Sequence, residues 1–407
     1  MVTHTIPGHP SFGGIGRYTF DLARGLHQRG HEVHIICRDE NPIHYEGLGF
    51  FIHGISDVAI NAVALDEFLP IVKKNVTFSL AVEKKLASLY MQGIEFDIVH
   101  ASNWEVEPIA LIREQAYPVT LMLVTPLAEL VKAEKWEIND DLKASMALDR
   151  WQIEHADVVC APSKGVLKSY ELYTNINMDG RAHLEVIPLG IIPQYLPAFP
   201  FQPGCRRLLF VGRLERIKGI HTLLEVLPDL MQRFPDWECH IVGDDQLPAV
   251  NDETFKQIFH GRHDGVAWLN RVIFHGMVSQ DELISHYQSC DLFVAPSLFE
   301  SFGLVFQEAM QHGKPVVSCL TGGIPEVVEH GMEGLLVQPD QPEALSSALA
   351  QLMQDDELRL RMGNAARERI LARDNYQTMT ARLEEVYRRV IVKKGAQYKA
   401  RRKSIWG

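Results

Sequence analysis

The chain has 407 residues, of which 46% are hydrophobic and 23% are charged. Since a single hydrophobic core stops growing at roughly 250–300 residues, this length predicts two domains, and the apolar content excludes a mostly disordered chain. There are 40 Lys and Arg residues against 52 Asp and Glu residues, which gives a formal charge of −12. A general nucleic-acid-binding protein needs a basic face and is therefore not expected.

The sequence also predicts a cellular compartment. No apolar run reaches the roughly 18 residues of a transmembrane helix, and no signal-peptide pattern follows Met1. The six cysteines are scattered, form no Cys-x-x-Cys pair and lie mostly within apolar runs. These features predict buried thiols in a reducing cytoplasm.

Short apolar segments alternate with helical patterns along the chain. The strands expected in the first half are residues 1–6, 32–37, 50–55, 97–101, 119–124, 157–161 and 184–188. Those expected in the second half are residues 207–211, 238–242, 272–276, 291–295, 315–319 and 334–337. The clearest helical patterns cover residues 17–29, 219–234, 303–312, 342–353, 357–373 and 376–392. This alternation predicts the α/β class, with parallel sheets covered by helices on both faces.

The alternation is interrupted once, at the Pro- and Gly-rich residues 194–204, which we interpret as a linker. We therefore expect two doubly wound Rossmann-like domains, residues 1–195 and 205–370, facing each other across a cleft. The chain ends with a helix at 375–392 and a basic tail at 393–407, which is expected to be solvated and disordered. The alternative for this tail is weak peripheral contact with the acidic inner face of a membrane.

Loops that follow strands carry the chemistry, because parallel sheets bind ligands at the carboxyl ends of their strands. The first such loop contains Gly13 and Gly14 and leads into the helix at 17–29. Glycine lets the backbone approach an anion closely, and a helix start offers free N–H groups. This loop is either a phosphate contact or a tight strand-to-helix turn.

A second loop carries two cations. Arg213 lies at the end of the strand 207–211, and Lys218 lies at the start of the next helix. A planar guanidinium and a compact ammonium together suit a diphosphate. The alternative is a pair of solvated charges.

The segment 297–310 is the most specific. Glu300 lies in the loop after a strand, and the following helix start leaves N–H groups free for an anion. Glu308 lies on the second helical turn and can reach back toward the same place. Carboxylates only accept hydrogen bonds, so this pair suits sugar or ribose hydroxyls. The alternatives are a helix-dipole partner for Glu300 and a solvated helix charge for Glu308.

A fourth glycine-containing loop, with Gly322 and Gly323, follows the strand 315–319. It either allows close approach to a ligand or is a plain turn.

Together these segments resemble the retaining glycosyltransferases of family 4 (glycosyltransferase group 1), which have the GT-B fold of two Rossmann-like domains. The resemblance is carried by GGIGRY, VGRLERIKG, FESFGLVFQEAM and TGGIPEVVEHGMEGLLVQP and is dense from Leu208 onward. The glutamate pair Glu300 and Glu308, combined with Arg213 and Lys218, is its signature.

The resemblance implies transfer of a sugar from a nucleotide-diphospho-sugar to an acceptor hydroxyl, with retention and without a metal or other cofactor. The acceptor would be a glycan, a lipid-linked compound or a small molecule. Arg213 and Lys218 would neutralise the diphosphate, Glu300 would contact the donor sugar, and Glu308 would bind the ribose. The remaining implied donor contacts are Gly13, Gly14, Met277, Val278, Ser301, Phe302, Gly303 and Leu304. The helix at 375–392 would pack back on the first domain.

Two positions in the first domain differ from a simple match. Many family members have a histidine where Val124 stands, so one donor contact is in question. His100, at the end of the strand 97–101, is either a substrate-binding residue or a satisfied strand-end histidine. The close pair His260 and His263 has no cysteine or carboxylate cluster beside it, so no metal site is expected.

Two other functions stay open on the sequence. One is a nucleotide-sugar epimerase on the same architecture, which the glutamate pair and the cation pair disfavour. The other is a non-catalytic nucleotide-sugar sensor or partner subunit, which only Val124 favours.

Overall fold

The computed structural model describes residues 1–6, 13–38, 49–55, 69–178, 183–193, 206–246, 249, 252–373 and 375–407. The expected linker at 194–204 lies outside the described residues, as does Cys205. The chain divides into two compact units. Unit 1 comprises Met1–Val131, Trp136–Ile192 and Asp374–Gly407, and unit 2 comprises Lys132–Lys135 and Pro193–Arg373.

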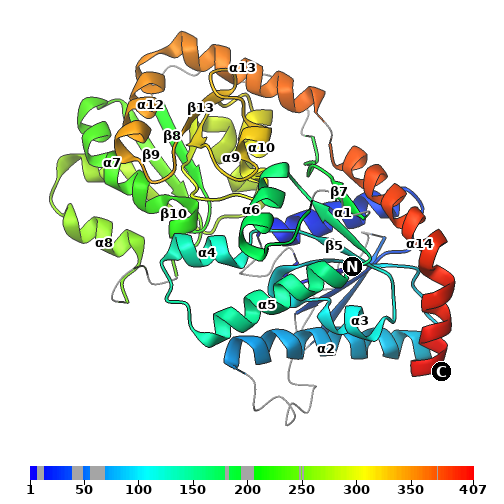
Figure 1. Cartoon of the computed structure of the whole chain (residues 1–407). Coiled ribbons are helices and arrows are strands. Elements are labelled where there is room, and N and C mark those ends of the chain that lie inside the picture. Colours follow the sequence, from blue (N-terminus) through cyan, green and yellow to red (C-terminus); the bar gives the residue numbers. More distant parts are fainter. Residues whose placement is uncertain are drawn as a thin grey trace. The chain divides into compact units, whose positions relative to one another are not determined.

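The described part of unit 1 contains a seven-stranded parallel sheet in the order β3-β2-β1-β4-β5-β6-β7. Its strands are β1 (Val2–Thr3), β2 (His34–Arg38), β3 (Phe51–Ile55), β4 (Val99–Ser102), β5 (Val119–Met122), β6 (Val158–Ala161) and β7 (Leu184–Val186). Its helices are α1 (Gly14–Gln28), α2 (Pro70–Met91), the 3₁₀ turn η3 (Trp104–Val106), α3 (Ile109–Glu114), α4 (Leu127–Glu134), α5 (Asp140–His155), α6 (Lys164–Thr174) and α14 (Tyr376–Trp406) (Figure 1). The end of α4 belongs to unit 2.

Unit 2, as far as it is described, contains a six-stranded parallel sheet in the order β10-β9-β8-β11-β12-β13. Its strands are β8 (Arg206–Val211), β9 (Trp237–Val242), β10 (Val272–Gly276), β11 (Leu292–Ala295), β12 (Val316–Cys319) and β13 (Gly334–Val337). Its helices are η4 (Arg216–Lys218), α7 (Ile220–Arg233), α8 (Phe255–Arg262), η5 (Ala267–Arg271), α9 (Gln280–Ser289), α10 (Leu304–Gln311), α11 (Ile324–Val327), α12 (Pro342–Gln354) and α13 (Asp356–Ala372).

The strands form because their apolar side chains are buried on both faces of each sheet. In β2, Ile35 and Cys37 pack in one cluster with Leu22 of α1 and Leu383 of α14. Ile36, which points to the opposite face, packs in a second cluster with Phe78 of α2. The α/β prediction is therefore confirmed, with one parallel sheet in each unit. The five cysteines within the described residues are buried free thiols, as expected.

The C-terminal helix differs from the sequence prediction. The tail 393–407 was expected to be solvated, but α14 continues through it to Trp406. Tyr398 and Arg402 are buried, Arg402 donates to the Ala116 carbonyl, and the Trp406 ring lies 5.7 Å from that of Tyr117. The expectation was wrong because the segment is rich in basic residues but also carries aromatic side chains on one face. That face packs against the rest of unit 1. Within the described residues, no helix has both the length and the apolar character to cross a membrane.

The buried carboxylate of Asp157 anchors this part of α14. One Asp157 oxygen accepts from the Val119 amide at 2.8 Å, and the other accepts from the Lys394 ammonium at 2.7 Å. The Tyr398 hydroxyl lies 2.9 and 3.0 Å from the two Asp157 oxygens. The last turns of α14 are thereby tied to the start of β5.

We predict that Tyr398→Phe lowers the free energy of unfolding by about 1.5–3 kcal/mol, the usual contribution of a hydrogen bond to a charged group. Urea unfolding followed by circular dichroism measures it. Tyr117→Phe is the matched control, because the buried Tyr117 hydroxyl has no hydrogen-bond partner in the described structure. Equal stability losses in the two variants would contradict the anchoring role.

Candidate functional site in unit 2 and a pocket in unit 1

The order of the strands in unit 2 reverses between β8 and β11. In open parallel sheets, ligands bind beyond the carboxyl ends of the strands at such a reversal. The loop after β8 carries Arg213 and Lys218, and the loop after β11 carries Glu300. The sheet topology therefore brings the predicted diphosphate-binding cations and the first predicted glutamate to one edge.

The side chains at this edge form one charged cluster. The Lys218 ammonium lies 2.7 Å from Glu300 Oε1, which also accepts from the Ser297 hydroxyl at 3.3 Å. The Arg213 guanidinium lies 2.8 Å from Glu215 Oε1 and is 53% exposed. Burial raises the pKa of Glu215, and the charges of Arg213 and Lys218 oppose this rise. Both cations thus act on the same carboxyl group, and Arg213 keeps an open face for an anion.

Two glycines let the loops of this cluster pack against each other. Gly219 has a φ of +73°, and a Cβ atom there would lie 1.9 Å from the Pro296 carbonyl oxygen. Gly322 has a φ of +51°, and its Cβ would lie 2.1 Å from the Glu300 carbonyl oxygen, which accepts from the Gly323 amide at 2.8 Å. Contact with the Glu300 backbone therefore explains the glycine at position 322 without a ligand.

The start of α10 lies beside Glu300 in sequence. Gly303 precedes the helix with a φ of +87°, which favours glycine, and Leu304 is its first residue. Phe302 is buried beneath the Arg373 guanidinium, at 5.1 Å from its ring centre. Ser301 and Leu304 are half-buried. The first N–H groups of an α-helix have no partner within the helix, so this end suits an anion.

The second glutamate is held by a neighbouring helix. Glu308 on α10 is half-buried and accepts a hydrogen bond from the Tyr287 hydroxyl of α9 at 3.0 Å. Tyr287 itself is only 2% exposed, so its hydroxyl is a fixed donor. After β10, Met277 is exposed and Val278 half-buried, which leaves both backbones near the surface.

In unit 1 the glycine loop and His100 have different environments. Gly13 and Gly14 are exposed at the start of α1, and a Cβ at Gly14 would meet nothing within 4 Å. Packing among the described residues therefore does not require glycine at position 14, so the tight-turn alternative gains no support there. His100 is buried and hydrogen-bonded to the Tyr18 hydroxyl at 2.8 Å, and burial lowers its pKa to about 3. His100 is thus an interior histidine whose Nε2 is paired with Tyr18, while its buried Nδ1 has no hydrogen-bond partner among the described residues. Its role as a substrate contact stays a prediction.

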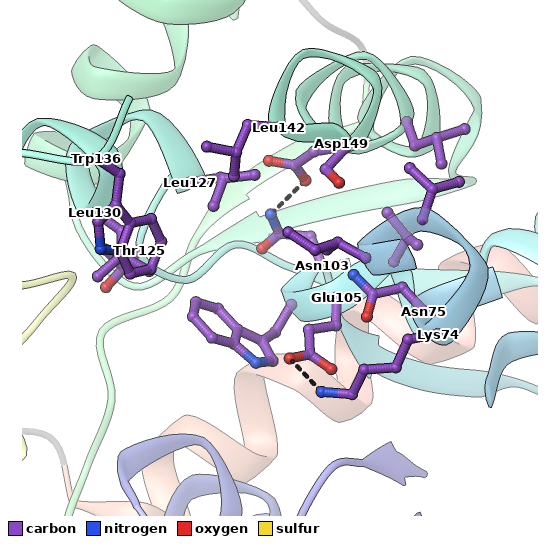
Figure 2. A pocket seen from close by; sticks show the side chains of 16 residues that line it. Lys74, Asn75, Asn103, Glu105, Thr125, Leu127, Leu130, Trp136, Leu142 and Asp149 are labelled. Atoms are coloured by element: carbon purple, nitrogen blue, oxygen red, sulfur yellow. Dashed lines mark hydrogen bonds and ion pairs between the residues drawn. The ribbon is translucent and has the colours of Figure 1, made fainter. Parts of the chain in front are cut away.

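Unit 1 also contains a pocket of about 270 Å³ at the carboxyl ends of β4 and β5 (Figure 2). Its walls come mainly from η3, α2, α4 and α5. The lining residues are Ile71, Val72, Lys74, Asn75, Asn103, Trp104, Glu105, Val106, Thr125, Leu127, Leu130, Trp136, Leu142, Ser145, Leu148 and Asp149. It is an apolar pocket with a small number of polar groups, as is typical of small-molecule sites.

The polar groups of this pocket are organised around Asn103. Its amide nitrogen donates to Asp149 at 2.7 Å (Figure 2). Its oxygen accepts from the Val124 amide at 2.9 Å. Burial raises the pKa of Asp149 to about 6. Asn75 Oδ1 and Ser145 Oγ are buried and have no hydrogen-bond partner among the described residues. A buried polar atom without a hydrogen-bond partner costs folding free energy. Such atoms therefore mark places where a ligand can bind.

The backbone on one wall of the pocket is strained. Glu105 and Val106 have φ values of 49° and 51°, the left-handed region that β-branched residues strongly avoid. The Glu105 carboxylate lies 3.2 Å from the Arg38 guanidinium and 3.7 Å from the Lys74 ammonium. Such strain is concentrated at functional sites and persists where surrounding contacts fix it.

Sequence reasoning missed this pocket. Asn103 follows a predicted strand, a position where polar residues often bind ligands, so the sequence did contain an indication of it. Asn75, Ser145 and Asp149 lie on helices at positions where a polar residue is normally read as solvated, so no local pattern indicated them.

Two family descriptions match the chain. "Glycosyltransferase Family 4" matches residues 12–195, and "Glycosyl transferases group 1" matches residues 195–369. The chain belongs to the group 1 glycosyltransferases. This membership supports a transferase over the sensor and epimerase alternatives.

The relatives of this glycosyltransferase include proteins with different names. It is 26% identical to the D-inositol 3-phosphate glycosyltransferase of Corynebacterium diphtheriae over 94% of this chain and 91% of that protein. It is 27% identical to the glycogen synthase of Mycobacterium tuberculosis over 92% of this chain and 91% of that protein.

Among solved structures, the fold is similar to sucrose-phosphate synthase from Thermosynechococcus elongatus, with a TM-score of 0.73 and 21% identity over 96% of this chain and 99% of that one. It is also similar to HepE from Anabaena in complex with UDP and glucose, with a TM-score of 0.69 and 21% identity over 94% and 97% of the chains. These similarities establish the GT-B fold.

We predict that Gly219→Ala destabilises the protein more than Gly265→Ala does. The two glycines have nearly equal φ values, +73° and +75°, but a Cβ at Gly265 would meet nothing within 4 Å. Both variants therefore carry the left-handed strain of roughly 1–2 kcal/mol. Gly219→Ala adds a clash with Pro296 that costs about 1–3 kcal/mol more. The free energies of unfolding in urea measure the difference, and equal values would show that the two loops do not pack as described.

Proposed function

We propose that this glycosyltransferase takes its sugar from a nucleotide-diphospho-sugar, with retention at the anomeric carbon and without a metal ion. The observation that carries the proposal is the charged cluster of Arg213, Lys218 and Glu300 at the strand-order reversal of unit 2. HepE, a structural neighbour, was solved with UDP-glucose, which agrees with such a donor.

The cluster would stabilise the leaving group, which is the nucleoside diphosphate. When the bond between sugar and diphosphate breaks, negative charge grows on the diphosphate. The Lys218 ammonium has three protons, so it can keep its bond to Glu300 and still donate to a phosphate oxygen. The exposed Arg213 guanidinium adds a planar pair of donors. Fixed donors aimed at developing charge are a large source of rate acceleration, and here they would replace a metal ion.

The remaining donor contacts follow the resemblance. Glu300 would accept from hydroxyls of the donor sugar, and Glu308, oriented by Tyr287, would accept from the ribose. Backbone groups near Met277 and Val278 would meet the base. We retain Gly13 and Gly14 as proposed phosphate contacts. The acceptor hydroxyl would attack from the face that the diphosphate leaves, passing its proton to a diphosphate oxygen, which gives retention.

We further propose that the pocket of unit 1 holds the acceptor. Asn75 and Ser145 offer unused hydrogen-bonding groups, and Asp149 offers a carboxyl oxygen, which together suit a compound with several hydroxyls. Trp104 and Trp136 in the lining supply flat apolar surfaces, against which the C–H face of a sugar or cyclitol packs well. The names of the relatives, an inositol phosphate glycosyltransferase and a glycogen synthase, fit an acceptor that is rich in hydroxyls.

We predict that Arg213→Ala and Lys218→Ala each lower turnover at least ~100-fold, because each removes a donor to the diphosphate. Release of nucleoside diphosphate from a panel of nucleotide sugars and acceptors measures turnover. Arg233→Ala is the control, since Arg233 forms an exposed ion pair with Asp229 on α7. Near-normal turnover in both site variants would refute the proposed function.

We predict that Asn75→Leu and Ser145→Ala each raise the KM for the acceptor about tenfold, which corresponds to the loss of one hydrogen bond of about 1.4 kcal/mol. The KM for the donor and the slow hydrolysis of the donor are expected to stay unchanged. Ser88→Ala on the exposed side of α2 is the matched control for the serine variant. If the KM for the acceptor is unchanged in both site variants, the proposal that the acceptor binds in this pocket is wrong.

A further inference from the structure

Three histidines that are separate in the sequence meet in unit 2. They are His240 on β9, His275 on β10 and His286 on α9. One ring nitrogen from each lies within 4.8 Å of the other two. The sequence analysis considered only histidines that are close to each other in the chain. These three are far apart in the sequence, so no motif indicated that they meet.

The distances within this histidine cluster are close to those of a metal site. His240 Nδ1 and His275 Nε2 are 3.0 Å apart. With zinc–nitrogen bonds of about 2.0–2.1 Å, two tetrahedral ligand atoms lie roughly 3.3 Å apart. The pair His240 and His275 is thus already near ligand spacing, and the His286 nitrogen lies within 4.8 Å of both, so rotation of the rings would bring the three nitrogens toward a common ion.

A carboxylate fixes the ring that joins the cluster to the sheet. His240 Nε2 donates to Glu238 Oε2 at 3.1 Å. This bond leaves the proton on Nε2 and turns the bare Nδ1 toward the other two histidines. Histidines that bind metals almost always donate their second ring nitrogen to a carboxylate or carbonyl in this way.

The protonation of the cluster also suits a cation. Burial lowers the pKa of all three histidines, that of His275 to about 4, so the rings are neutral at pH 7. The nearby positive charge of Arg207 lowers these pKa values further. Arg207 would also oppose a bound cation, but its guanidinium lies 3.9 Å from Glu238, whose charge offsets it.

The irregular end of β10 helps to build the cluster. The register between β10 and β9 shifts between Phe274 and Gly276, so His275 lies at a bulge in an edge strand. Bulges of this kind redirect a side chain. The residue after Gly276 is Met277, one of the proposed contacts to the base of the donor.

We propose that His240, His275 and His286 bind a divalent transition-metal ion, Zn²⁺ in the first instance, with water completing a tetrahedral shell. Imidazole nitrogen is a preferred ligand of this class of metal. The ion would tie β9, β10 and α9 together at the edge of the unit 2 sheet. It takes no part in the proposed sugar transfer, which uses Arg213 and Lys218 on other loops.

Isothermal titration of the full-length, chelator-treated protein with zinc chloride tests this proposal. We expect one equivalent of Zn²⁺ per chain, an increase in Tm on zinc addition, and a visible spectrum typical of tetrahedral Co²⁺ when cobalt is used instead. His286→Ala is expected to abolish all three signals, and its partial exposure makes it a tolerable change for the fold. The control is the double variant His260→Ala with His263→Ala, which should bind zinc like the unaltered protein.

The role of Glu238 is tested separately as that of a positioning residue. Glu238→Gln should weaken zinc binding about 10–100-fold while the stoichiometry stays at one. Zinc binding that is absent from the unaltered protein, or that is equal in the unaltered protein and in His286→Ala, would overturn the proposal. Because every readout is binding or Tm, these outcomes are independent of whether the proposed sugar transfer is correct.

Discussion

The ion pair between the Lys218 ammonium and the Glu300 carboxylate joins the two loops on which the donor site depends. These loops follow β8 and β11, the strands between which the order of the sheet reverses. Backbone contact supports the pair. Gly219 lets the loop after β8 approach Pro296 in the loop after β11, and Gly322 lets the loop after β12 approach the Glu300 backbone, more closely than a side chain would permit. The pair is only partly exposed, so it holds its geometry while the lysine keeps protons free for a phosphate.

The pocket of unit 1 differs from the charged cluster of unit 2 in how its polar groups are partnered. At the charged cluster of unit 2 the cations Lys218 and Arg213 are paired with the carboxylates of Glu300 and Glu215. In the pocket, Asn75 and Ser145 have buried polar atoms that the described protein leaves unused. The strained backbone at Glu105 and Val106 shows that the surrounding contacts hold this wall in place. A pocket whose walls are held in place and whose polar groups lack protein partners is suited to binding a small compound with several hydroxyls.

Electrostatics accounts for the other unusual features. The basic end of α14 stays folded because its cations and tyrosine meet Asp157 and backbone carbonyls while its aromatic face is buried. The histidine cluster stays neutral because burial and Arg207 both disfavour protonation. In both cases the side chains are held by partners from segments that are distant in the sequence.

The sequence by itself determined the strands, the α/β class, and the positions of Arg213, Lys218 and Glu300, because apolar runs and loop residues after strands are local patterns. It left His100 with two possible roles, and only the tertiary structure shows that His100 is buried with Nε2 bonded to Tyr18. The pocket around Asn103, the cluster of His240 with two other histidines, and the folded tail were decided by tertiary structure alone. Their partners lie on different strands and helices, so no local spacing encodes them, and they exist only once the sheet order has set which segments are neighbours.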